Sequence, residues 1–195
     1  MRTCRQPDIS PGLFFGLAAA MLLLPLGWLL ALVFAALVHE VCHMIAVRLC
    51  GGQIGHIRFG AGGAVIQAFS LSPGKALFCT LAGPLGSLLL LPLARWFPRL
   101  AICAAVQSVY NLLPVRGLDG GHALRYLAAA FLPPRAAESL CRITERILLA
   151  ALAFLGFYGT FILKLGVLPI LIAGCLVIKG TSGKIPCKSG PMRVQ

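Results

Sequence analysis

The stretch LVHEVCHMIA, residues 37–46, places two histidines and a glutamate near the end of a long apolar run. The run begins around Leu13 and is long enough to cross the hydrocarbon core of a bilayer, which takes about 20 helical residues. Ionisable side chains are costly inside a membrane and are candidates for function wherever they occur there. The chain has only five acidic residues. The position of Glu40 between His39 and His43 therefore predicts a functional site.

Composition extends the membrane prediction to the whole chain. Hydrophobic residues make up 59% and charged residues 11%, and the mean hydropathy is +0.93, whereas a soluble domain carries about 25% charged residues. We predict a mainly α fold, a polytopic membrane helical bundle that forms one domain over residues 1–195. Its six apolar segments are expected at about 12–25, 27–49, 76–94, 99–132 (interrupted), 146–163 and 166–179.

The basic residues predict an orientation and exclude a nucleic-acid partner. The net charge is +12, but the Lys and Arg residues are spread thinly between apolar segments and do not form a stripe on one face. With six crossings, all but three of the 17 basic residues fall on one side of the membrane, the exceptions being Arg95, Arg99 and Lys164. Because cytoplasmic loops carry the excess of Lys and Arg, this split predicts a multi-pass cell-membrane protein with both termini in the cytoplasm.

A polar, glycine-rich stretch separates the second and third apolar segments. Residues 51–70 read GGQIGHIRFGAGGAVIQAFS, and apolar residues flank the turn-forming GAGG. This pattern predicts a short β-hairpin with strands at about 56–59 and 64–69. Non-helical backbone near a membrane must be buried in protein or reach water. We therefore expect the hairpin at the cytoplasmic interface or against the bundle.

The histidines and Glu40 form an H-E-x-x-H pattern on a segment that must be helical. Residues at i and i+4 share a helix face, so the imidazoles of His39 and His43 can reach one metal ion. Zinc suits paired imidazoles, and Glu40 can take a proton from a water molecule that zinc activates. The alternative is a polar cluster that only joins helices.

A catalytic zinc site normally has a third protein ligand, and the candidates are the acidic residues. Asp8 lies in the polar N-terminal tail, and Glu138 and Glu145 lie among arginines, which predicts a solvated, charge-paired helix face. Asp119 lies in NLLPVRGLDGGHAL, residues 111–124, an apolar segment broken by proline and glycines. Such a break can point Asp119 at the metal, or Asp119 can cap a helix that resumes after Gly121. The residues alone leave both open.

His122 follows this motif closely enough to be considered as a further ligand. A fourth protein ligand would displace the catalytic water. We therefore expect His122 to lie beside the ligands or at a helix interface.

The HEVCH segment, the AGPLGS at 82–87 and the NLLPVRGLDGG at 111–121 together resemble the site-2 protease family of intramembrane zinc metalloproteases, over roughly residues 12–130. The resemblance implies that His39, His43 and Asp119 hold one zinc ion per chain and that Glu40 is the catalytic acid and base. It also implies a substrate-binding role for Asn111 and Pro114. The family often carries Asn a few residues after the G-P of its third span, where this sequence has Ser87.

The resemblance implies hydrolysis of a peptide bond in or next to a membrane segment of a protein substrate. The catalytic core would span about 27–132, and we expect no PDZ or CBS domain. The layout looks most like the sporulation branch of the family, which processes a precursor sigma factor. Expected partners are a membrane or membrane-associated substrate, the lipid bilayer and regulatory membrane proteins.

Three other functions remain open from the sequence. A membrane-embedded zincin of the soluble type would take Glu138 or Glu145 as its third ligand. A metal transporter would use the same polar residues as a pathway. A non-catalytic membrane scaffold would keep the fold and need neither His39 nor His43.

Overall fold

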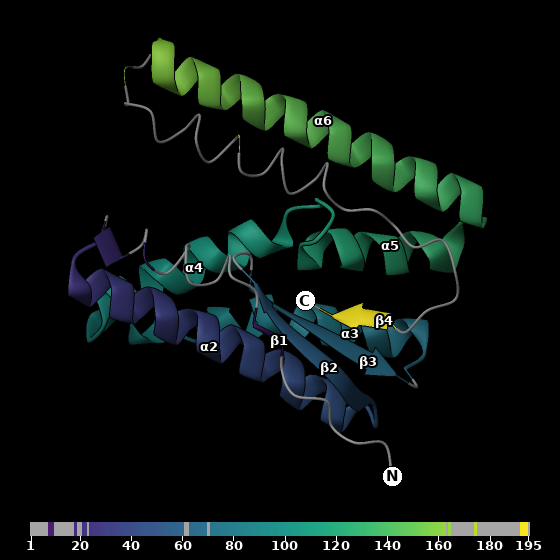
Figure 1. The fold of residues 1–195 in the computed structure, drawn as a ribbon. Coiled ribbons are helices and arrows are strands. Elements are labelled where there is room, and N and C mark those ends of the chain that lie inside the picture. Colours follow the sequence, from purple (N-terminus) through teal and green to yellow (C-terminus); the bar gives the residue numbers. More distant parts are fainter. Residues whose placement is uncertain are drawn as a thin grey trace. The chain divides into compact units, whose positions relative to one another are not determined.

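The computed structural model describes residues 8–9, 18, 21–22, 24–60, 63–69, 71–162, 164, 174 and 192–194. The chain divides into two compact units, residues 1–112 with 190–195 (unit 1) and residues 113–189 (unit 2). Figure 1 labels the α-helices and strands that the text names. The division into units does not test the expectation of a single domain over residues 1–195, which remains a prediction.

Helix α2 (Leu26–Leu49) carries the H-E-x-x-H pattern and is apolar on both faces. Pro25 precedes its first turn, where the missing N–H of proline is harmless and its fixed φ favours helix entry. The buried side is formed by the two histidines together with Leu29, Ala35, Ala46 and Val47. The opposite side exposes large apolar side chains: Leu26, Leu30, Phe34, Leu37 and Ile45. Since water penalises such a surface and lipid does not, α2 has the character of a membrane helix.

A second segment has the length and hydropathy of a membrane span. Leu26–Leu49 has a mean hydropathy of 2.1 and Pro73–Arg95 one of 1.9 over the best window. The second segment consists of α3 (Pro73–Leu88) followed by a 3₁₀ helix, η1 (Leu91–Arg95). The tightening at η1 follows from Pro92, which has no N–H to continue an α-helix. Both segments are therefore long and apolar enough to cross a membrane, and the six crossings remain a prediction.

Small side chains let the helices of unit 1 pack closely. Helix α4 (Pro98–Leu112) packs against both α2 and α3. The buried positions between these helices are mostly Ala, Gly and Ser, the residues that favour close helix contact in lipid. The hydroxyl proton of Ser108 on α4 is shared between the carbonyl oxygen of Ala104 in its own helix, at 2.7 Å, and that of Pro84 on α3, at 3.1 Å. The second of these adds one polar link to this apolar contact.

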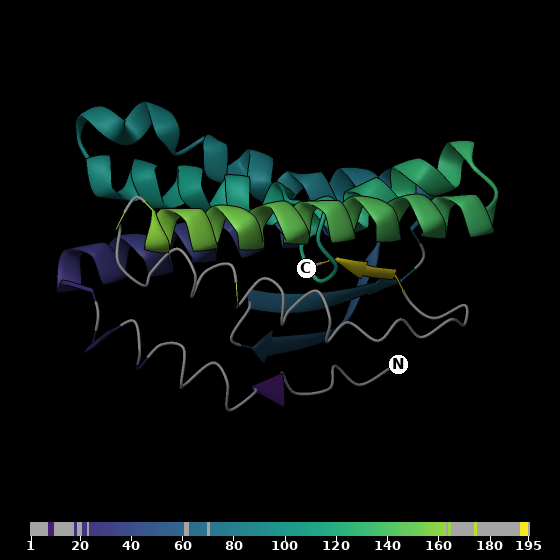
Figure 2. The same cartoon turned by 90° about the horizontal axis from the view of Figure 1, so that it is seen from above.

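The strands of unit 1 form a sheet larger than the expected hairpin. β2 (Gln53–Gly60) and β3 (Gly63–Phe69) pair antiparallel. β1 (Asp8–Ile9) pairs parallel with β2, and β4 (Met192–Val194) pairs antiparallel with β3, in the order β1-β2-β3-β4. Figure 2 shows the strands along one side of the unit 1 helices. The antiparallel pair of β2 and β3 lies between α2 and α3, where the hairpin is expected. Two extended segments distant in sequence pair with its outer backbone groups and enlarge it to a sheet.

Unit 2 begins where the predicted fourth segment is interrupted. After α4 ends at Leu112, residues 113–118 are non-helical, and α5 (Asp119–Phe131) and α6 (Pro134–Phe161) follow. The interruption expected within 99–132 is therefore present. The fifth segment, expected at 146–163, is the second half of α6, which starts twelve residues earlier. Pro134 sits in the first turn of α6, where it favours helix entry.

Most of the first and sixth predicted segments, 12–25 and 166–179, lies outside the described residues. The orientation of the chain stays a prediction too. We expect a cysteine engineered into the 95–98 turn to be labelled by a membrane-impermeant maleimide from outside the cell, because only three basic residues fall on that side. Trp96 and Phe97 are 68% and 60% exposed there, so a label can reach the turn. Labelling only after the cell is opened would contradict the six-span arrangement.

Candidate metal centre

The two histidines of α2 are buried in unit 1 and face each other. His39 is 2% exposed and His43 is not exposed at all. They lie one helical turn apart, as the i, i+4 spacing predicts, and their Nε2 atoms are 3.2 Å apart. The two imidazoles thus share one face of α2 and face each other across this distance.

Helix α3 fixes which nitrogen of each imidazole carries the proton. His43 Nδ1–H donates to the backbone carbonyl oxygen of Cys79 at 2.8 Å, because a carbonyl can only accept. Ser87 Oγ donates to the carbonyl oxygen of Gly83 at 3.1 Å. Ser87 Oγ therefore accepts from His39 Nδ1–H, also at 3.1 Å. Such partners orient metal-binding histidines and set their tautomer.

Both Nε2 atoms consequently present lone pairs toward the same space when the imidazoles are neutral. Two lone pairs 3.2 Å apart repel unless a proton or a metal cation lies between them. Two nitrogens at about 2.05 Å from one zinc ion and 3.2 Å from each other subtend roughly 103° at the metal, near the tetrahedral angle of about 109°. The separation of the imidazoles thus fits two adjacent ligands of one zinc ion.

Gly83 on α3 makes room for this arrangement. A Cβ at position 83 would collide with the ring of His43, and one at position 86 would collide with the side chain of Cys42. The glycines of AGPLGS therefore let α3 approach α2 closely enough for Cys79 and Ser87 to hold the imidazoles. Sequence reasoning assigned no role to Gly83, Ser87 or the Cys79 carbonyl.

Two further expected site residues lie in unit 1. Asn111, near the end of α4, has its side-chain Nδ2 3.2 Å from His39 Nε2, so its amide lies at the edge of the histidine pair. Glu40 lies on α2 directly after His39, and its Oε2 atom is shielded from solvent.

In unit 2, Asp119 is the first residue of α5 and is 1% exposed. The N-cap residue of α5 is Leu118, and the helix begins at Asp119. The alternative prediction, in which Asp119 caps a helix that resumes only after Gly121, is therefore wrong. Gly117 has φ +81°, which favours glycine. A Cβ at Gly121 would meet the carbonyl of Val115. The glycines of GLDGG thus let residues 113–118 fold onto the first turn of α5.

The structure also gives the positions of Pro114 and His122, the other residues considered in this segment. Pro114 lies in the non-helical connection before α5 and is half-buried. The backbone N–H of His122 donates to the carbonyl oxygen of Leu118 at 3.2 Å, which begins the hydrogen-bond ladder of α5.

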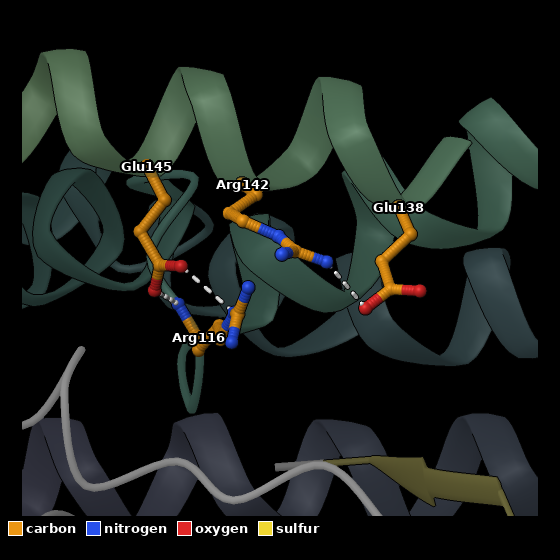
Figure 3. Close-up of polar contacts among 4 residues, drawn as sticks. All are labelled: Arg116, Glu138, Arg142 and Glu145. Carbon is orange, nitrogen blue, oxygen red and sulfur yellow. Dashed lines mark hydrogen bonds and ion pairs between the residues drawn. The ribbon is translucent and has the colours of Figure 1, made fainter. Parts of the chain in front are cut away.

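The two glutamates of α6 each bind an arginine within unit 2 (Figure 3). Glu145 Oε2 lies 2.8 Å from Arg116 Nε, and its Oε1 accepts from the Arg116 backbone N–H at 2.9 Å. Glu138 Oε1 accepts from Arg142 at 2.8 Å, one turn away, with both side chains about half exposed. Glu138 fits the solvated, charge-paired face that the sequence predicts. The same expectation is wrong for Glu145, which is only 5% exposed, because its partner comes from the loop before α5.

These pairs weigh against either glutamate as a third ligand. Both oxygens of Glu145 are used by Arg116, and only the glutamate side of this ion pair is buried, so breaking it costs less than the about 3–5 kcal/mol of a fully buried pair but is still unfavourable. By contrast, His39, His43 and Asp119 are buried side chains that could hold a metal ion, with one ligand atom each. Two imidazoles and a carboxylate are a ligand set that zinc takes in catalytic sites, where it leaves a fourth position open.

The hydrogen bond from His39 to Ser87 leads to a prediction on metal affinity. We expect Ser87→Ala to weaken zinc binding by about 10–100-fold, because His39 then loses the acceptor that fixes its ring and tautomer. Competition with a chromogenic chelator measures the change. Ser108→Ala is the matched control, since Ser108 is equally buried and also bonds to α3 but touches neither histidine. Equal affinities of the two variants would contradict a role for Ser87.

Comparison with known proteins finds a similar fold among solved structures. No protein-family model matches the chain, and no curated protein matches it. Among solved structures it is similar to a site-2 protease from Methanocaldococcus jannaschii, with a TM-score of 0.64 and 17% sequence identity. The match covers 91% of this chain and 89% of that protein. At this identity the likeness is one of fold.

Proposed function

From a site-2-protease-like fold and a buried, oriented histidine pair, we propose that the chain is an intramembrane zinc metalloprotease. It hydrolyses a peptide bond in or next to a membrane segment of another protein. The observation that carries the proposal is the pair of imidazoles whose Nε2 atoms lie 3.2 Å apart while both Nδ1–H groups are held by α3. This pair of imidazoles, which is arranged to bind a cation, lies on a helix with the length and hydropathy of a membrane span.

We assign the zinc ligands to His39, His43 and Asp119, one ion per chain. Asp119 is supported by its burial at the start of α5 and by the engagement of Glu138 and Glu145 with arginines. When bound there, zinc supplies a Lewis acid that polarises the scissile carbonyl and lowers the pKa of a water molecule toward about 7.

Glu40 is the proposed general base and acid. It adjoins His39 on α2 without being a ligand in the H-E-x-x-H pattern. Its carboxylate accepts the proton of the attacking water and then passes it to the leaving amine nitrogen, a transfer that contributes about 10²–10⁴-fold to a rate. The buried position of its Oε2 atom keeps this proton from exchanging with bulk water.

Asn111 and Pro114 are the proposed substrate-binding residues. The Asn111 amide, 3.2 Å from His39 Nε2, can hydrogen-bond a substrate backbone beside the ligands. Pro114 follows in a segment without helix hydrogen bonds of its own, and its ring restricts that backbone. The segment can therefore keep a fixed surface toward an extended substrate.

The finer proposal concerns substrate and setting. The motif layout supports a precursor sigma factor or a membrane-bound transcription regulator as the substrate, with regulatory membrane proteins as further partners. The positive-inside bias supports cytoplasmic termini and a site toward the cytoplasmic side, because α2 ends next to Arg48.

Co-expression with candidate membrane-associated precursor proteins tests the proposed function. We expect a shortened product in cells that make the wild-type chain and none in cells without it. A zinc chelator added to membranes from these cells should stop cleavage, and added zinc should restore it. A product that forms equally with the chelator would contradict zinc-dependent proteolysis.

A substrate helix must also be unwound before its backbone can reach the site, and unwinding frees N–H and C=O groups that are costly if unpaired. We propose that the substrate adds as an extended strand to the sheet of unit 1. The register of β1 covers Arg58 and Phe59 of β2, so the stretch from Gln53 to Ile57 extends beyond it. Neither β2 nor β3 is outermost in the sheet, so an added strand would lie beside β1 or displace a short outer strand.

Single proline substitutions at Ile57, Val65 and Ile66 test strand addition. Proline removes a backbone donor from a paired strand, so we expect at least one variant to keep zinc and expression yet lose most cleavage. Alanine at the same position is the matched control, because it changes the side chain and keeps the donor. Three proline variants that fold and cleave at the wild-type rate would show that no strand is added.

A further inference from the structure

Unit 2 contains a cavity of about 290 Å³ between the second half of α5 and the first half of α6. Its apolar wall includes Ala129, Leu132 and Ala137. Its polar wall consists of Arg116, Arg125, Glu138 and Cys141. A cavity of this size with one apolar and one charged wall suits a small amphipathic group. None of these residues belongs to the proposed catalytic site.

The charges lining the cavity leave an excess of one positive charge. Arg116 is neutralised by Glu145, and Glu138 by Arg142. Arg125 has no ion-pair partner in the part of the chain that the structure describes, and it is half-buried. Its guanidinium therefore offers donors inside a partly apolar cavity, where a charge-assisted hydrogen bond to phosphate is stronger than in water.

The cavity lies where α6 changes from charged to apolar. The first thirteen residues of α6 include all five of its charged residues, the last being Arg146. The following turns expose large apolar side chains: Ile147, Phe154, Leu155, Phe157 and Phe161. This order along one helix matches the passage from headgroup region to hydrocarbon, and basic pockets at that depth bind lipid headgroups.

We propose that this cavity binds the phosphodiester of an anionic phospholipid, with Arg125 as the principal donor and the apolar wall against the glycerol and the first acyl carbons. One phosphodiester carries one negative charge, which matches the excess charge of the cavity. A zwitterionic headgroup adds a cation next to Arg125 and Arg116 and binds less tightly. The bound lipid ties α5 to α6 beside the break at residues 113–118.

The rate at which the Cys141 thiol is alkylated can report whether the cavity is occupied. Burial raises the pKa of the Cys141 thiol, whereas Arg125 and Arg116 lower it. A bound phosphodiester covers the thiol and neutralises the nearby guanidinium, and both effects slow its alkylation. Cys50 in unit 1 is also partly exposed and unbridged, and it serves as the control within the same chain.

The test uses the full chain in detergent with added phosphatidylglycerol or phosphatidylcholine, and follows alkylation of each cysteine by peptide mass spectrometry. We expect phosphatidylglycerol to slow alkylation of Cys141 and not of Cys50. Arg125→Gln should weaken this protection by about fivefold in lipid concentration, the factor for roughly 1 kcal/mol per basic side chain. Arg125→Lys should keep most of it. Arg135→Gln is the matched control, because it removes the same charge from α6 away from the cavity wall.

Three results would overturn the proposal. Equal protection by both lipids would show that the headgroup charge is not recognised. Protection by inorganic phosphate or by an acidic peptide that matches phosphatidylglycerol would assign the cavity to a soluble anion or a protein segment. Equal losses in Arg125→Gln and Arg135→Gln, with unchanged thermal stability, would show that only the surface potential matters.

Discussion

Glu40→Gln is expected to abolish cleavage and to leave the protein in the membrane with zinc bound. Glutamine keeps the size of the side chain and removes only its ability to take up a proton. General acid–base catalysis contributes about 10²–10⁴-fold, so cleavage should fall by that factor. Cleavage of a co-expressed substrate, followed by immunoblot at several times after induction, measures the loss. Zinc content of the purified variant should equal that of the wild type.

The control for Glu40→Gln is Glu138→Gln, which removes a carboxylate that is half exposed and paired with Arg142. We expect this variant to cleave normally. The comparison also separates the rival functions. A metal transporter tolerates Glu40→Gln better than a hydrolase does, and a scaffold is indifferent to it. Cleavage by Glu40→Gln at a near wild-type rate would contradict the proteolytic function.

Asp119→Ala is expected to have the second large effect, the loss of bound zinc. Zinc sites with four protein ligands bind with about 10–16 kcal/mol, so one ligand contributes several kcal/mol. Removing the carboxylate of Asp119 should weaken binding by at least about a hundredfold and reduce the metal content from one zinc per chain to a small fraction. Elemental analysis of the purified variant measures this directly.

Glu145→Gln is the discriminating control for Asp119→Ala. It keeps an acceptor for Arg116 while it removes the charge that a soluble-type zincin would need. We expect it to retain zinc, although it should be less stable, because the half-buried Arg116 loses its counter-charge. The reverse pattern, with zinc lost in Glu145→Gln and retained in Asp119→Ala, would favour the soluble-type zincin.

The sequence predicts those features that depend on local pattern. The spacing of His39 and His43 predicts a shared helix face, and the proline and glycines of residues 111–121 predict the interruption between α4 and α5. Both follow from the 3.6-residue period and from backbone restrictions of single residues. The fold expected from the family resemblance agrees with the similarity to a solved site-2 protease.

Features that depend on contacts between residues distant in the chain cannot be predicted from the sequence pattern. Nothing local to Ser87 or Cys79 says that they face the histidines of another helix, although AGPLGS signals a close approach. Residues 8–9 and 192–194 pair with the sheet through backbone hydrogen-bonding groups. Any extended segment can supply these groups, so no sequence pattern predicts the pairing. Glu145 has arginines three residues before and one after it in sequence, yet its partner is Arg116, because tertiary packing overrides the helix-surface pattern.

The central claim, zinc-dependent hydrolysis of a membrane protein by this chain alone, is tested by reconstitution. The purified chain and a purified substrate are incorporated into liposomes, with zinc present or removed by a chelator, and intact masses of the products are recorded. We predict two fragments whose masses sum to that of the substrate plus one water, with the cut in or next to its membrane segment. Their formation should require zinc and the Glu40 carboxylate. An intact substrate in the presence of the zinc-loaded wild type, or fragments that form equally without zinc, would contradict the account.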